Sequence, residues 1–193
     1  MRYFEAKFTL RHVTRKQLNH YKIHQQVEKV IAGDEFGDKV KTRYLFDYVI
    51  DENSNSASVS VRTLQRTNLP GEVEHNASPF IGQSVSFWLH FKPKMSQTKG
   101  NKSEVYIENQ ALRYGRLLDR LIEAGLDVVN FDEIEETYRK FKKGRHSFVQ
   151  RGARYKVDAV IVDPAKFEIA FTNGVGPKAS FGYGKMILIP GGE

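Results

Sequence analysis

The sequence predicts an α+β protein with two tandem ferredoxin-like (RRM-like) domains, the first of them degenerate. Segments with apolar residues at every second position alternate with segments of helical spacing, and the second half follows the order β-α-β-β-α-β of that fold. In the first half only β-α-β-β is recognisable, because residues 67–79 follow neither period. We therefore expect an N-terminal domain over residues 1–78 and a C-terminal domain over 79–193.

The elements of the first domain are expected in the following order. Apolar and polar residues mostly alternate over Arg2–Leu10, which predicts a strand. A helix is expected over Asn19–Ile31, because four apolar residues recur there at helical spacing. Two more alternating segments, Arg43–Ile50 and Ala57–Gln65, predict strands that the polar residues 51–56 join as a hairpin.

The second domain begins with an alternating segment over Gln83–Lys92, which predicts a strand that stops at Pro93. Residues 93–103 are polar, and we expect them to be mobile. A helix is expected over Ile107–Ala124, with Gly125 just after its end. The residues that this helix is expected to bury are Ala111, Leu117, Leu118, Leu121 and Ile122.

The rest of the second domain is expected to form a hairpin, a short helix and a last strand. The hairpin turns around Lys142–Arg145, and its return strand runs through Tyr155–Ile161. Asp163 and Pro164 form a good helix start, an N-cap followed by proline at the first helical position. The final strand is expected over Lys185–Ile189.

Composition excludes several classes of protein. The chain has no cysteine, so disulfides, thiolate metal sites and cysteine nucleophiles are excluded. No run of about 18 apolar residues is present, and the alternating, charged start is unlike a signal peptide. The formal net charge of +7 favours a polyanionic partner, with nucleic acid ahead of an anionic membrane. We expect a soluble, cytoplasmic protein that does not bind membranes.

Tyr21 and His24 are the candidate catalytic residues. On an ideal helix they lie about 60° apart, beside the buried stripe rather than in it. A phenol and an imidazole held on one rigid element suit general acid–base catalysis. The alternative for this pair is a structural role at the edge of the core.

No metal site or cofactor is expected. His20 and His24 have the i, i+4 spacing of a helical metal pair, but no third ligand is evident and only His12 lies nearby. A metal-dependent nuclease that uses the two helical histidines with Asp34 or Glu35 stays open as an alternative.

Basic residues gather in the second domain and predict contacts with phosphates. They are interleaved with aromatic residues that could stack on bases. The alternative is a solvated charged surface. The basic residues expected to bind RNA are Arg113 and Arg116 on the helix, and Arg139, Lys140, Lys142, Lys143, Arg145 and Arg151 on the hairpin.

A glycine-rich segment near the C-terminus could bring backbone close to phosphates. It lacks the ending of a Walker loop and leads into a strand, so a tight helix-to-strand connection is the alternative. Its candidate RNA-binding residues are Gly174, Gly176, Lys178, Gly182 and Gly184.

Four segments together resemble one known family, the CRISPR precursor-RNA endoribonucleases of the CasE type (subtype I-E, in the repeat-associated RAMP superfamily). Asn19–His24 is similar to the family's catalytic helix start, where a tyrosine and a histidine stand three apart. Gly82–Pro93 resembles a family strand, and Tyr155–Ala159 stands where the family usually has an aromatic-x-Gly-x-Leu strand, with Val157 in place of the glycine. Gly174–Gly184 resembles the family's C-terminal glycine-rich signature and is the most specific match.

The resemblance implies a protein that binds the hairpin of a CRISPR repeat RNA and cuts precursor crRNA at the 3′ base of the stem. It implies attack by the 2′-OH without metal, which leaves 2′,3′-cyclic phosphate and 5′-OH ends. It also implies that the protein stays bound to the product as one subunit of a multi-subunit CRISPR effector complex, the surveillance complex or Cascade.

Carried over by residue, the resemblance assigns proton transfer to His24 and positioning of the 2′-OH or phosphate to Tyr21. Lys29 is a further candidate for RNA contact, because the developing phosphorane is negative, although it lies about 140° from His24 on an ideal helix. The alternative function is a non-catalytic subunit that binds the crRNA hairpin without cutting it.

Overall fold

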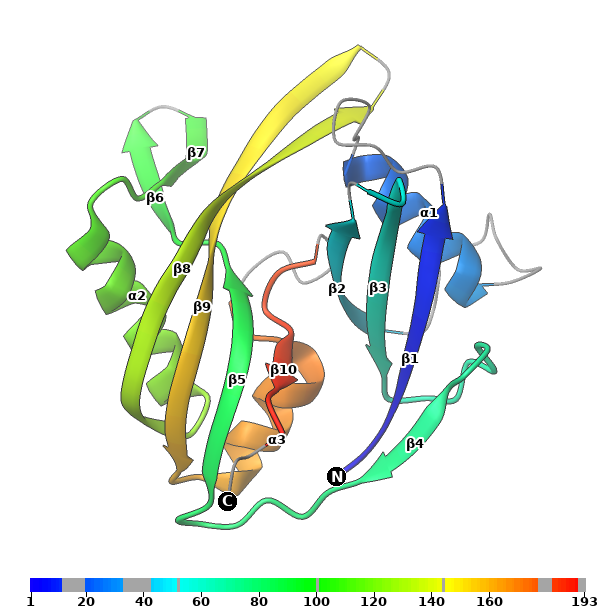
Figure 1. The fold of residues 1–193 in the computed structure, drawn as a ribbon. Coiled ribbons are helices and arrows are strands. Elements are labelled where there is room, and N and C mark those ends of the chain that lie inside the picture. Colours follow the sequence, from blue (N-terminus) through cyan, green and yellow to red (C-terminus); the bar gives the residue numbers. More distant parts are fainter. Residues whose placement is uncertain are drawn as a thin grey trace.

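Two antiparallel four-stranded sheets form the framework of the protein in the computed structural model (Figure 1). The structure describes residues 1–11, 20–32, 43–51, 53–99, 101–143, 145–176 and 182–190, with only the backbone of 95–99, 101–105, 143 and 146. In the described residues the N-terminal sheet has one helix on one of its faces and the C-terminal sheet has two, and both sheets have the strand order of a ferredoxin-like domain. The predicted α+β class with tandem ferredoxin-like domains is confirmed.

The N-terminal sheet has the order β2-β3-β1-β4, and α1 packs on one of its faces. Its elements are β1 (Arg2–Arg11), α1 (His20–Ala32), β2 (Tyr44–Asp51), β3 (Ser56–Thr63) and β4 (Val73–Asn76). The first four are the predicted elements, within two residues at each described end. Asn19, where the helix is expected to begin, lies outside the described residues.

Strand β4 completes this sheet, although no strand is expected there from the sequence. It pairs with β1 from Arg2↔Asn76 to Glu5↔Val73. It has four residues, and Val73 is half exposed, so no alternating apolar pattern marks it. The described residues between β3 and β4 contain no helix, which agrees with the expected degeneracy of this domain.

The C-terminal sheet has the order β10-β5-β9-β8, with α2 and α3 packed on one face. The predicted helix start at Asp163 is confirmed, because its side chain accepts a hydrogen bond from the Lys166 amide and Pro164 follows it. The bounds are β5 (Ser84–Phe91), α2 (Gln110–Glu123), β8 (Leu126–Lys143), β9 (His146–Ile161), α3 (Pro164–Asn173) and β10 (Met186–Leu188).

A small separate hairpin lies where the sequence predicts a mobile polar segment and no strand, over residues 93–103. Strands β6 (Lys94–Lys99) and β7 (Asn101–Tyr106) pair with each other from Lys94↔Tyr106 to Lys99↔Asn101. The hairpin belongs to neither large sheet, so one of its faces need not be apolar. For that reason its sequence lacks the alternation that marks the other strands.

The buried face of α2 also differs from the prediction. Leu117 and Leu121 are fully buried, as expected, but Leu118 and Ile122 are 36% and 57% exposed and Ala111 is exposed too. Arg113 takes the remaining buried position, because its guanidinium donates to the carboxylate of Glu133 on β8. The ion pair of Arg113 and Glu133 thus occupies a buried position where an apolar contact is expected. As a result, the face that α2 buries is not its most apolar face.

The two domains are tied together by a buried arginine. Arg62 of β3 donates to the carbonyl oxygens of Phe171 and Met186, both at 2.9 Å, and its guanidinium lies 3.5 Å from the ring centroid of Phe171. The predicted boundary between residues 78 and 79 lies in the segment between β4 and β5 and stays a prediction. In the part of the chain that the structure describes, no helix is long and apolar enough to cross a membrane.

Candidate functional site

Helix α1 presents the candidate catalytic residues at the edge of the N-terminal core. Ile23 and Val27 are buried against the sheet. The imidazole of His24 and the carboxylate of Glu28 lie on the same helix and are partly exposed. Tyr21 and His24 are both partly exposed, with ring centroids 6.3 Å apart. The structure therefore brings together the two residues that the sequence pairs, on the flank that the helical spacing predicts.

The imidazole of His24 has a protein group near each ring nitrogen. Nδ1 lies 3.3 Å from the hydroxyl of Tyr44, and Nε2 lies 3.4 Å from a carboxylate oxygen of Glu28. The ring of Phe46 is nearly parallel to the imidazole, with centroids 6.2 Å apart. The imidazole is thus held in one orientation while its side chain keeps 12% of its surface exposed.

The protonation states of this cluster follow from its burial. Burial lowers the pKa of His24, and the negative charge of Glu28 opposes this shift. Burial, with Glu28 nearby, raises the pKa of Tyr44 far above its usual value. At neutral pH His24 is therefore a neutral imidazole that can accept a proton, and Tyr44 keeps its own.

His20 has a different role from His24, although it lies only one turn earlier. It is buried, its Nδ1 is hydrogen-bonded to the hydroxyl of Tyr48, and its ring lies 5.7 Å from that of Phe141 on β8. Burial, with Arg139 nearby, lowers its pKa to about 3. It stays uncharged and packs the start of the candidate catalytic helix against the long β8–β9 hairpin.

The structure shows no metal site among the described residues, where no three histidine or carboxylate side chains lie close enough to share an ion. The remaining proposed ligands, His12, Asp34 and Glu35, lie outside the described residues.

The basic residues near the tip of the β8–β9 hairpin point to solvent. Lys140, Lys142 and Arg145 are exposed, and the backbone of Lys143 continues β8 between them. The hairpin extends well beyond both sheets in Figure 1. We refer to Lys140, Lys142, Lys143 and Arg145 as the basic tip. Elsewhere, Lys29 on α1 and Arg116 on α2 are also exposed.

Three other arginines expected to bind RNA are engaged by side chains of the protein itself. Arg113 is 4% exposed and lies 2.7 and 3.0 Å from the carboxylates of Glu133 and Glu136. Arg139 is 5% exposed and lies 3.4 Å from the carboxylate of Asp47. Arg151 pairs with Glu108 and Glu136 and lies over the rings of Tyr106 and Tyr138. These contacts already compensate the charges of the three arginines, which are therefore not part of the RNA-binding surface that we propose.

Arg139 lies at the centre of a buried network between the two domains. It donates to Nδ1 of His90 at 2.5 Å and to the carbonyl oxygen of Gly182 at 2.9 Å, and it lies 3.4 Å from Asp47. Its guanidinium also stacks over the ring of Tyr48, 4.4 Å from the centroid. Burial raises the pKa of Asp47, but its contacts with His90 and Arg139 outweigh this and lower it to about 2.

The glycine-rich segment makes close contacts within the protein. Gly182 has φ +81°, and a Cβ there would lie 2.6 Å from Nη1 of Arg139. Gly184 has φ +82°, its amide donates to the carbonyl of His90, and a Cβ would lie 2.4 Å from the carbonyl oxygen of Val175. Gly174 and Gly176 also have positive φ, whereas Lys178 lies outside the described residues. These close contacts support the alternative interpretation of the segment, a tight connection between helix and strand.

Sequence reasoning missed Glu28 and Tyr44. Glu28 follows His24 by four residues, so helical spacing alone could have placed it on the same flank. Tyr44 comes from β2, and only the packing of α1 on the sheet brings its hydroxyl to His24. Asp47 and Tyr48 were missed for the same reason.

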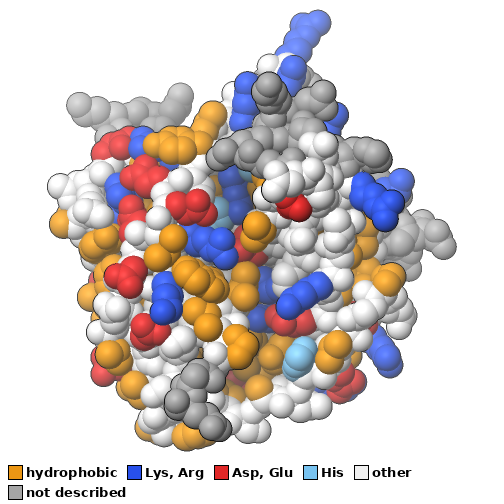
Figure 2. All heavy atoms as spheres, viewed as in Figure 1, with side chains coloured by type: hydrophobic (Ala, Val, Ile, Leu, Met, Phe, Trp, Pro, Cys, Tyr) orange, Lys and Arg blue, Asp and Glu red, His pale blue; other side chains and the backbone are white. Residues whose placement is uncertain are grey.

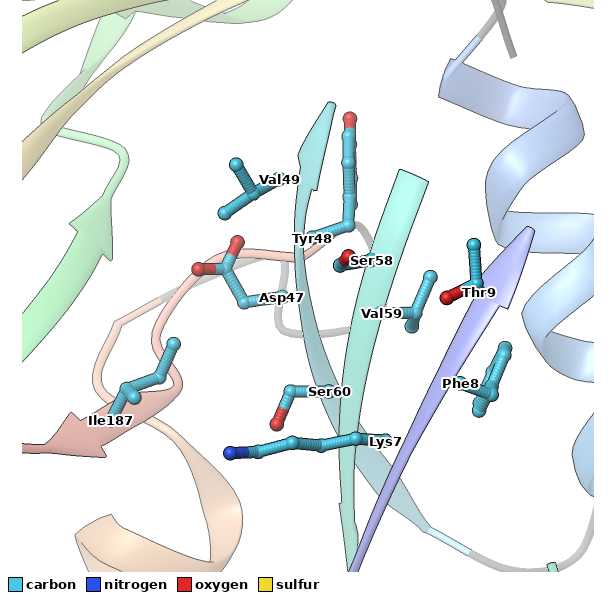
Figure 3. A pocket seen from close by; sticks show the side chains of 10 residues that line it. All are labelled: Lys7, Phe8, Thr9, Asp47, Tyr48, Val49, Ser58, Val59, Ser60 and Ile187. Carbon is cyan, nitrogen blue, oxygen red and sulfur yellow. The ribbon is translucent and has the colours of Figure 1, made fainter. Parts of the chain in front are cut away.

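Two hollows lie along the cleft between the domains. One, of about 590 Å³, is lined by residues of β2, β8 and β9 that include Arg139, Lys140 and Arg154. The other, of about 310 Å³, lies on the face of the N-terminal sheet opposite α1 (Figure 3). Figure 3 shows Lys7, Asp47 and Ser60 on the side of this sheet that faces Ile187 of β10.

Two sheets of this topology, with one long hairpin, define the chain as a tandem ferredoxin-like protein. A family model described as CRISPR associated protein matches residues 4–190, and the chain belongs to that family. No curated protein matches the sequence.

Solved structures of low sequence identity share the fold. CRISPR endoribonuclease Cse3 bound to a 19-nucleotide RNA has a TM-score of 0.77 and 18% identity, covering 98% of this chain and 99% of that chain. Cas6e from Escherichia coli K-12 has a TM-score of 0.72 and 18% identity, covering 98% and 100%. A chain of a CRISPR RNA-guided surveillance complex has a TM-score of 0.65 and 15% identity, covering 96% and 100%.

Proposed function

We propose that this protein is a cytoplasmic endoribonuclease that binds the hairpin of a CRISPR repeat RNA and cuts precursor crRNA at the 3′ base of the stem. The observation that carries the proposal is the position of His24. Its imidazole is neutral, oriented and partly exposed, and it lies on a helix whose start packs against the hairpin that carries the basic tip. Membership of the CRISPR associated family and the fold shared with Cse3 and Cas6e support it.

The nucleophile in this proposal is the 2′-OH of the RNA. The chain has no cysteine that could act as a nucleophile of its own. His24 transfers a proton, either from the 2′-OH or to the 5′-oxygen that leaves, and Tyr21 orients the attacked phosphate. The O2′–P bond forms as the P–O5′ bond breaks, so the products end in a 2′,3′-cyclic phosphate and a 5′-OH.

RNA binding is assigned to the basic tip, with Lys29 and Arg116 as further exposed cations. An A-form stem presents its phosphates to such a surface, and its 2′-OH groups distinguish RNA from DNA. After cleavage the protein stays on the stem and acts as a subunit of the CRISPR surveillance complex. The shared fold with a chain of such a complex supports this part of the proposal.

The experiment that tests the function is cleavage of a repeat hairpin in EDTA, with analysis of the product ends. A matched substrate carries a single 2′-deoxy nucleotide just 5′ of the scissile phosphate. We expect the unmodified RNA to give a cyclic phosphate, and the deoxy RNA to bind but stay intact, because the stem contacts are mostly to phosphates. Cutting of the deoxy RNA, or strict dependence on a divalent ion, would overturn the mechanism. Tight binding without any cutting would favour the non-catalytic subunit.

A further inference from the structure

The face of the C-terminal sheet opposite its helices carries side chains unlike those of an ordinary solvated face. Along β5 and β9 the residues that pack under α2 and α3 are Phe87, Leu89, Tyr155 and Val157. The residues between them therefore point to the other side of the sheet. We call this side the open face.

Trp88 lies at the centre of the open face. It is the single tryptophan of the chain and is partly exposed, and β5 is one of the two central strands of the sheet. Across the strands it is flanked by Lys156 on β9 and by Ile187 on β10. A large, partly exposed ring beside a cation is thus placed in the middle of the sheet.

Arg154 lies two residues before Lys156 on β9, and therefore on the same open face of the sheet. Its guanidinium lies 5.0 Å from the ring centroid of Trp88, and its Nε is buried without a hydrogen-bond partner. Asp132 and Glu135 lie opposite Lys156 and Arg154 on β8, yet among the described residues neither cation forms an ion pair. Among the described residues, both cations therefore lack the carboxylate partners that Arg113 and Arg151 have.

The surroundings leave room for a ligand. Arg154 also lines the hollow of about 590 Å³ between the two sheets. Figure 2 looks onto the open face and shows lysine and arginine side chains beside hydrophobic ones over the middle of the sheet, with acidic side chains towards β8. The polyanion that this surface accepts must approach along the central strands, away from that acidic edge.

We propose that the open face is a second RNA site, which binds an unpaired nucleotide of single-stranded RNA by stacking on Trp88 and Arg154. Bases stack on aromatic side chains and on guanidinium planes of central strands in sheets of this topology. Lys156 lies next to the ring, where it contacts the adjacent phosphate. The basic tip lies at the far end of the β8–β9 hairpin, so this site serves RNA outside the hairpin stem.

The tryptophan itself reports on the site. Titration of the full chain with an unstructured adenosine decamer is expected to quench its fluorescence in a saturable way, and more weakly at high salt. Labelled decamer then measures the affinity of variants by anisotropy. We expect Trp88→Leu to weaken binding by roughly five-fold to a hundred-fold, the range of one lost base stack. Lys156→Gln should flatten the salt dependence by roughly 0.7 in log–log slope, because it removes a phosphate contact. Arg154→Gln should weaken binding, because it removes the guanidinium plane on which the base stacks.

Lys166→Gln on α3 is the matched control, because Lys166 is exposed and lies on the helical side of the same domain. Circular dichroism checks that each variant is folded. If Trp88→Leu does not fold, Arg154→Gln and Lys156→Gln still test the proposal. Unchanged fluorescence at saturating decamer, or equal affinity of Arg154→Gln, Lys156→Gln and the control, would overturn the proposal. The assay involves no cleavage, so its failure would leave the proposed nuclease function untouched.

Discussion

On helix α1, Glu28 lies one turn after His24, with Oε1 3.4 Å from Nε2 of the imidazole. Its carboxylate favours the protonated ring and so raises the pKa of His24, while burial lowers it by a larger amount. The imidazole is thus neutral at pH 7, but its affinity for a proton depends on the charge of Glu28. This dependence gives the proposed catalytic residue an experimental signature.

Glu28→Gln is expected to move one limb of the pH–rate profile to lower pH. Loss of the carboxylate removes the charge that favours imidazolium, so the pKa of His24 falls further. If His24 is the base, its pKa sets the acidic limb of the profile, and if it is the acid, its pKa sets the alkaline limb. In either case the limb set by His24 moves to lower pH. Single-turnover cleavage rates from pH 5 to 9 measure the shift. A limb that stays in place would show that His24 does not titrate in the reaction.

His24→Ala is expected to slow cleavage by roughly two to four decades, the range for loss of a general acid or base. Binding of the hairpin should be nearly unchanged, because His24 borders the buried stripe of α1 without belonging to it, so its loss should not unfold the helix. Rates at saturating protein and dissociation constants from filter binding separate the two effects. His75→Ala on β4 is the matched control, and equal rates for both variants would remove His24 from the mechanism.

Tyr21→Phe and Tyr44→Phe distinguish the two phenols near His24. Tyr21 is assigned to the substrate, so loss of its hydroxyl should lower the cleavage rate, though by less than His24→Ala because the ring remains. Tyr44 holds Nδ1 of the imidazole, and its loss should also alter the pH profile. Single-turnover profiles of both variants make the comparison. A larger rate loss and an unchanged profile for Tyr44→Phe would exchange the two roles.

Charge reversal in the basic tip tests the RNA surface. Lys140→Glu, Lys142→Glu and Arg145→Glu together are expected to weaken hairpin binding and to lower the log–log salt slope by somewhat under one unit for each lost phosphate contact. Lys166→Glu on α3 is the control for the change in net charge. If the slope changes no more than in the control, the stem is bound elsewhere, and Lys29 and Arg116 become the next residues to change.

The sequence was sufficient for the elements whose pattern is set by one sheet face or one cap. Strands β1 to β3 and β5 alternate because one side is buried, and α3 begins at Asp163 and Pro164 as predicted. The sequence was insufficient for strands that are defined by backbone hydrogen bonds to a neighbouring strand and not by a buried apolar face. Strand β4 buries little, and the hairpin β6–β7 belongs to neither large sheet, so no alternating apolar pattern marks either of them in the sequence.

The candidate site divides in the same way. Tyr21 and His24 share a helix, and helical geometry was enough to pair them. Arg113 and Arg139 looked like phosphate ligands in sequence, because the acids that neutralise them, Glu133 and Asp47, come from other strands. Contacts between elements decide which cations are available, and local spacing does not contain that information.

The buried pair of Arg139 and Asp47 leads to a prediction about stability rather than RNA. Arg139→Met leaves a carboxylate buried without its cation, which costs about 3–5 kcal/mol in comparable cases. Urea unfolding at pH 7 measures this loss, and Arg145→Met, an exposed arginine of the same hairpin, should change the free energy of unfolding by less than about 0.5 kcal/mol. Equal effects of the two substitutions would contradict the assignment of Arg139 to the interior.

The loss caused by Arg139→Met should also shrink in acid. The wild-type pKa of Asp47 is about 2, so its stabilising contribution is present above about pH 4 and is lost as pH falls towards 2. The wild-type pKa of His90 is about 4, lowered first by burial and then by Arg139, so protonation of His90 also costs the wild type stability as pH falls from about 6.5 to 4. Without Arg139 both pKa values rise, and the variant is less sensitive to acid. Unfolding at pH 7 and pH 4 tests this, and a constant difference between wild type and variant would mean that neither group senses Arg139.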